Sequence, residues 1–191
     1  MTPTCESPVP FDTLVDGSLG ELPGEAQDRF DEHMLSCESC HARLEAVVRL
    51  GADIARAVST GAVSAWVTED LVRQIEAAGR HVRHYRLRPG ETVPCTVSPD
   101  DVFVATHLTG PFPDDRPVRG DINFHDLTTG ARQTWPVGEL PIDRDTGTVV
   151  MLNPGAVMRA YPRSHITVEL RTDDGSPIGT YHFDHTPWES R

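Results

Sequence analysis

The sequence predicts an α+β protein of two domains, a helical bundle over residues 1–80 followed by an antiparallel β-sandwich or barrel over residues 81–191. Three observations predict this. Apolar residues recur at helical spacing before residue 80, they alternate with polar residues after it, and glycine- and proline-containing turn signals separate the alternating stretches. A chain of 191 residues is long enough for two small domains, each with its own core.

Three helices are expected in the first part of the chain. A short helix covers residues 11–15 and is closed by Asp16-Gly17. A proline begins the second helix, over residues 23–35, and a third helix covers about residues 37–58. The apolar positions expected on the inner faces of the last two helices are Phe30, Met34, Leu44, Val47, Val48 and Ile54.

A fourth helix is expected after a break at residues 59–61. It begins near Ser64 or Thr68 and ends before Gly79. It is amphipathic, and its apolar side packs either on the chain itself or on a partner; the sequence leaves both open. The residues on that side are Trp66, Val67, Leu71 and Ile75.

From His81 onward the period of the apolar residues changes to two, which is typical of strands. Short strands at this spacing, with no helices between them, predict an antiparallel sandwich or barrel of ~110 residues. The expected strands are residues 82–87, 93–97, 102–108, 118–125, 148–152, 166–170 and 178–184.

His33, Cys37 and Cys40 form an H-x3-C-x2-C motif that is typical of a metal site. Zinc prefers four tetrahedral nitrogen and thiolate ligands, and two cysteines at this spacing reach one ion through a short turn. His33 precedes Cys37 by about one helical turn, so its imidazole can bind the same ion. Cys5 is the expected fourth ligand. We expect the zinc to be structural, because so small a bundle has little core without it.

The same residues permit other interpretations. Cys37 and Cys40 could form a redox pair, but that motif usually lies in a βαβ context, which is missing here. His33 could instead interact with the C-terminal end of its helix. His41 is the main competitor for a ligand position, but it follows Cys40 directly and would point in a different direction on the helix, so it is expected at most beside the ligands and not among them.

With these residues in view, the segment from Cys5 to Leu50 resembles the zinc-binding anti-sigma domain of bacterial anti-sigma factors. The resemblance covers the first 80 residues, about two-fifths of the chain. It implies a three-helix bundle with a fourth helix on a flexible link, which binds a sigma factor of the extracytoplasmic-function type and keeps it from RNA polymerase. It rests on Cys5, residues 14–19, residues 30–40 and residues 42–45.

The resemblance also implies a partner-binding role for the fourth helix. Trp66, Leu71 and Ile75 would be apolar anchors for the sigma factor, with Glu69 and Asp70 as a charged rim. In some relatives, oxidation of the ligand cysteines releases both the zinc and the sigma factor. The sequence leaves a redox switch and an inert structural zinc both open.

The β domain carries no recognisable catalytic motif, so no enzymatic activity, catalytic residue or small-molecule ligand is predicted. Cys95 is expected to be a buried apolar residue. We interpret the domain as a sensory or regulatory module. Two alternatives remain: a ligand-binding or adaptor β-sandwich that uses the zinc bundle structurally, and a metal-dependent enzyme with a second site. The histidines available to such a site are His107, His125, His165, His182 and His185.

Composition and charge limit the functions further. A net charge of −12 argues against direct binding to nucleic acid and suits a basic partner. The first ten residues lack the features of a secretory signal, and no stretch approaches the ~20 apolar residues of a membrane span. The expected location is the cytoplasm, where four cysteines are more typical of metal ligands or redox thiols than of structural disulfides.

Overall fold

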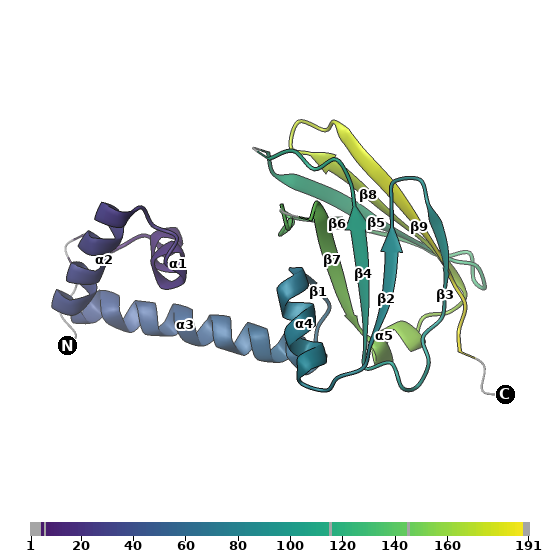
Figure 1. Ribbon diagram of the computed structural model, residues 1–191, viewed down its shortest axis with the longest axis horizontal. Helices are drawn as coiled ribbons and strands as arrows, with labels where there is room; N and C mark the ends of the chain where they lie inside the picture. The colour runs from purple at the N-terminus through teal and green to yellow at the C-terminus, as the bar shows by residue number, and fades with distance from the viewer. Residues whose placement is uncertain (1–4, 6, 115, 145, 189–191) are drawn as a thin grey trace. The chain divides into compact units, whose positions relative to one another are not determined.

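The computed structural model describes residues 5, 7–114, 116–144 and 146–188. By contacts the chain divides into two compact units, Met1–Ala57 and Val58–Arg191, which Figure 1 shows as a helical unit and a unit built mainly of strands. Among the described residues, no helix combines the length and the apolar character that crossing a membrane requires.

The helical unit contains α1 (Phe11–Leu19), α2 (Gly24–Ser36) and most of α3 (Glu38–Ser59). Helices α2 and α3 begin and end within one or two residues of their predicted bounds. Helix α1 is longer than predicted, because Gly17 lies inside it and the helix stops at Gly20, whose φ of 71° is left-handed.

Gly17 is buried in α1 because the ring of Phe30 packs directly on it. A Cβ atom at this position would lie 2.6 Å from the Phe30 ring, so only glycine permits this approach of α1 to α2. The glycine that the sequence suggested as a helix stop is therefore a packing site.

The core of the helical unit is small. Val48 and Ile54, which were predicted on the inner stripe of α3, are 55% and 56% exposed, so the core ends near Val47. One of its buried members is a cysteine. The buried members are Leu14, Phe30, Met34 and Cys40, and Cys5, Val9, Leu22, Cys37, Leu44 and Val47 are partly buried around them.

The β unit contains two sheets. The first has the strand order β1 (Ala65–Val67), β7 (Thr148–Pro154), β4 (Phe103–Thr109), β2 (Val82–Leu87). The second has the order β3 (Thr92–Cys95), β9 (Pro177–His185), β8 (Ser164–Thr172), β5 (Val118–Asp126), β6 (Arg132–Val137).

The sheets are mixed and open, and therefore differ from the antiparallel arrangement that the sequence predicts. β2 pairs with β4 in parallel, and β3 pairs with β9 in parallel. The reason is that consecutive strands β2 and β3 belong to different sheets, so each pairs with a strand distant in sequence. No described strand pairs one sheet with the other, so the sheets do not close into a barrel.

Side chains from both sheets share one core. Apart from Leu140, its buried residues come from strands β2 to β9, so both sheets contribute to it. The fully buried members with the largest side chains are Leu87, Leu108 and Tyr181.

Residues 58–80, which the sequence placed with the helical domain, pack on the first sheet. Helix α4 (Glu69–Ala77) buries Val72 and Ile75, which are 1% and 4% exposed, against β4 and β7. Trp66 was predicted on this helix but lies in β1, where it pairs with Met151. The central strands of the sheet, β4 and β7, are buried on both faces, and α4 covers the outer face.

The sequence also missed β6 and the short helix α5 (Gly155–Arg159). The sequence of β6 shows no alternation of apolar and polar residues, because β6 is an edge strand whose first five residues are all exposed. It contains Pro136, which the ladder tolerates only at such an edge.

A buried carboxylate holds the start of β2 to the loop before β4. Asp101 is fully buried; its Oδ2 accepts hydrogen bonds from Arg83 Nε at 2.6 Å and from the Ser98 amide at 2.7 Å. Burial alone would raise the pKa of Asp101, but these two donors outweigh it and hold the pKa below its ordinary value of 3.8.

Replacing Asp101 by Asn is expected to destabilise the β unit by about 1.5–3 kcal/mol at pH 7, because a charged acceptor of two hydrogen bonds is lost. Since the folded-state pKa is depressed, this contribution is complete above about pH 4 and is lost as the pH falls through the folded-state pKa. Urea unfolding of D101N and wild type at several pH values measures it. The exposed neighbour Asp100→Asn is the control, and an equal effect of both variants would contradict the assignment.

Candidate metal centre

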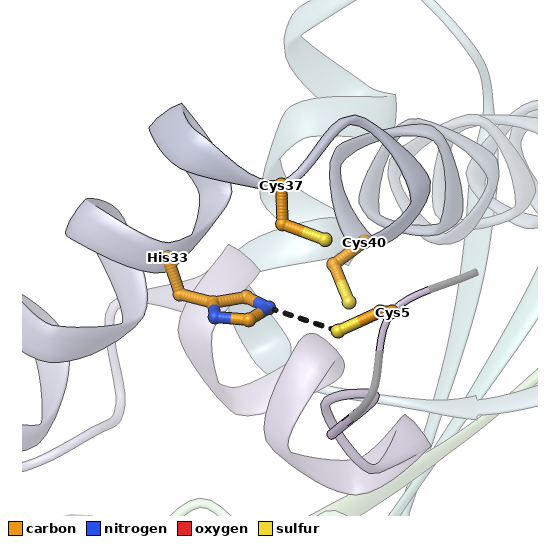
Figure 2. A group of neighbouring side chains, drawn as sticks. All are labelled: Cys5, His33, Cys37 and Cys40. Carbon is orange, nitrogen blue, oxygen red and sulfur yellow. Dashed lines mark hydrogen bonds between the residues drawn. The ribbon is translucent and has the colours of Figure 1, made fainter. Parts of the chain in front are cut away.

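The four predicted ligands come together where α2 meets α3. His33 lies in the last turn of α2, Cys37 is the single extended residue between the helices, and Cys40 lies in the first turn of α3. Cys5 approaches from the N-terminal segment. Figure 2 shows the four side chains pointing toward a common centre.

The geometry fits a tetrahedral zinc ion. One ligand atom from each residue lies within 4.8 Å of every other, and Cys5 Sγ is 3.8 Å from His33 Nε2. Zinc–sulfur and zinc–nitrogen bonds of about 2.3 and 2.0 Å place tetrahedral ligand atoms about 3.5–3.8 Å apart. Three soft thiols and one imidazole are a donor set that zinc prefers. The four residues therefore lie close enough to bind a metal ion, and their donor set is consistent with zinc.

Backbone amides favour the thiolate form of Cys37 and Cys40, which are two of the three thiols, whereas the pKa of Cys5 is raised. A hydrogen bond from the backbone of Cys40 lowers the pKa of Cys37 to about 6, as is typical of a thiol at a helix N-terminus. The backbone of Val9 likewise lowers the pKa of Cys40. The side chain of Cys40 raises the pKa of His33.

His41 does not join the four ligands. Its Nε2 lies 3.6 Å from Glu45 Oε1, one turn further along α3, and both side chains are more than half exposed. The structure thus separates the two histidines that competed for the ligand position, and brings His33 to the three thiols.

The five predicted partner-binding residues do not form one exposed surface. Ile75 is buried and Leu71 packs partly on the same cluster. Glu69 is largely covered, with its side chain 20% exposed, whereas Asp70 is 64% exposed and pairs with Arg73. Trp66 faces the inside of the β unit.

A hydrogen-bonded chain that the sequence did not reveal joins α4 to the sheet. Glu69 Oε1 lies 2.6 Å from His107 Nδ1, His107 Nε2 lies 2.8 Å from His84 Nδ1, and His84 Nε2 lies 2.9 Å from Glu76 Oε1. Burial lowers the pKa of His107, and the hydrogen bond to Glu69 acts in the opposite direction.

The other histidines of the β unit do not form a second metal site. Within the described part of the chain, only the Cys5 cluster brings three or more such ligand atoms together. His165 instead pairs with Asp184 at 2.8 Å and stacks on His182. Cys95 lies 3.6 Å from His185, and burial raises its pKa to about 12, so it stays a neutral thiol as expected of a buried residue.

A scan of protein-family models finds none that matches the chain, and a search of curated proteins finds no match either.

One zinc ion per chain is expected when metal content is measured by native mass spectrometry on the purified protein. Cys40→Ser should lose the ion, because the remaining three ligands leave an open coordination position. Cys95→Ser is the matched control and should keep it, since Cys95 lies outside the cluster. A C40S protein that retained one tightly bound zinc would contradict the ligand set.

Glu69→Ala is expected to lower the free energy of unfolding of the β unit by about 1–3 kcal/mol more than Asp70→Ala. Both variants remove a carboxylate from the first turn of α4, so effects of the helix dipole cancel in the comparison. The difference reports the buried His107 nitrogen that only Glu69 satisfies. Urea denaturation followed by circular dichroism measures it, and equal losses would show that the His107 contact is not stabilising.

Proposed function

We propose that this chain is a zinc-binding anti-sigma factor, which binds a sigma factor of the extracytoplasmic-function type and withholds it from RNA polymerase. The observation that carries the proposal is the convergence of Cys5, His33, Cys37 and Cys40 on one point between two helices. The resemblance of residues 1–80 to the anti-sigma domain supplies the partner class. The net charge of −12 supports a protein partner with a basic surface and not direct contact with DNA.

We place the docking surface on the helical unit. α4 packs its apolar side on the β unit, so Ile75 and Leu71 are not free to anchor a partner while it stays there. The helical unit, in contrast, exposes large apolar side chains that its own small core does not use. Leu50 and Ile54 on α3 are 51% and 56% exposed, and Phe11 on α1 is 58% exposed.

In this proposal the two units have different roles. The helical unit, stapled by zinc, binds the sigma factor, and the β unit acts as the sensory or regulatory module. No catalytic step is assigned to either unit, and the cytoplasm is the proposed location because the partner acts there. The zinc supplies rigidity: it holds the ends of α2 and α3 and the N-terminal segment in one arrangement.

A ligand-binding or adaptor protein is the second candidate function. The observation in its favour is an apolar cavity inside the β unit, described in the next subsection. In that case the zinc cluster would serve only to fold the helical unit.

Coexpression with the extracytoplasmic-function sigma factors of the same genome is expected to yield a 1:1 complex with one of them, measured by native mass spectrometry. The double variant Leu50→Asp and Ile54→Asp should weaken this complex by at least about tenfold, because two apolar contacts become desolvated carboxylates. Leu127→Asp is the control, since Leu127 is similarly exposed at 51% but lies on the β unit.

Absence of a complex with every such sigma factor would overturn the proposal. If Leu127→Asp weakened the complex equally, the sigma factor would still be the partner, but the docking surface would not lie on α3.

A further inference from the structure

A cavity of about 290 Å³ lies between the two sheets at the edge formed by β1 and β6. One wall comes from Trp66 of β1 and from Met151 and Asn153 of β7. The opposite wall comes from Phe124 of β5 and Trp135 of β6. The cavity therefore continues the shared core at the point where the two sheets separate.

The size of the cavity is large for a packing defect. Protein interiors are close-packed, and voids larger than a water molecule are few. An apolar cavity of about 150 Å³ holds one benzene molecule. A volume of 290 Å³ therefore accommodates a molecule of about two rings.

The walls offer flat aromatic surfaces. Phe124 lies 5.4 Å from Tyr161 and 6.0 Å from Trp135, measured between ring centroids, so three rings form a connected wall. Trp66 and Met151 add a further ring and a polarisable thioether. No lining residue carries a charge, so the cavity favours a neutral occupant.

Asn153 supplies a polar group that the protein itself does not use. Asn153 is 7% exposed and lines the cavity, and its side-chain amide makes no hydrogen bond to another described residue. The amide is not among the fully enclosed unpaired polar atoms of the described residues, so it stays accessible and can bond to a ligand's polar group.

We propose that this cavity binds a neutral, planar aromatic molecule of about two rings that carries one hydroxyl or carbonyl group. The rings would lie against the aromatic wall, and the polar group would bond to the Asn153 amide. This inference does not depend on the zinc cluster or on the sigma factor.

The test uses the zinc-loaded full chain and three probes, 1-naphthol, naphthalene and 1-naphthoate, titrated by isothermal calorimetry. 1-Naphthol is expected to bind saturably at one site per chain. Naphthalene should bind about tenfold more weakly, because it lacks the group that bonds to Asn153, and charged 1-naphthoate should not bind measurably.

Two cavity variants and one control complete the design. Asn153→Leu keeps the size of the side chain and removes no internal hydrogen bond, so it should fold normally and abolish the preference for 1-naphthol. Ile122→Trp, at another lining position, should fill the space and weaken both neutral probes at least tenfold. Trp188→Phe, at an exposed tryptophan outside the cavity, should change nothing.

No saturable binding of 1-naphthol to the wild type would overturn the proposal. An unchanged preference in N153L would do the same, and so would equal binding of 1-naphthoate. Circular dichroism confirms folding of each variant, and if Ile122→Trp does not fold, N153L alone decides.

Discussion

The helical unit depends on three thiols and one imidazole meeting where α2 ends and α3 begins. Among the described residues, its apolar core has four buried members, and one of these is the candidate ligand Cys40. A core of this size contributes little, whereas a structural zinc site, where one is bound, contributes about 10–16 kcal/mol, more than the net stability of most domains. Cys40 therefore belongs both to the hydrophobic core and to the candidate metal cluster.

The outer face of the first sheet is apolar where α4 packs on it, and this determines the position of α4. Strands β4 and β7 are buried on both faces, so the face turned away from the second sheet needs a cover. Val72 and Ile75 provide that cover, and the Glu69–His107 contact adds a polar attachment. A partner that used the apolar side of α4 would first have to displace it from the sheet, whereas the exposed apolar residues of α3 need no such rearrangement.

The polar side chains of the β unit that have little exposure differ in their hydrogen bonding. Asp101 accepts two hydrogen bonds through Oδ2, and His107 bonds through both ring nitrogens. The side-chain amide of Asn153 makes no hydrogen bond to another described residue, and it lines the apolar cavity. The first group stabilises the fold, and the second leaves binding capacity unused by the fold itself.

The sequence by itself determined the helices of the first unit, most of the strands and the four residues of the metal cluster. These features depend on short-range patterns: hydrophobic periodicity within an element, and ligands that lie within about one helical turn of each other apart from Cys5. Only the tertiary structure decided that Trp66 belongs to a strand, that α4 packs on the sheet, and that β2 and β3 pair in parallel with distant strands. The physical reason is that these outcomes depend on which faces remain uncovered after the sheets assemble, and no local stretch of sequence records that.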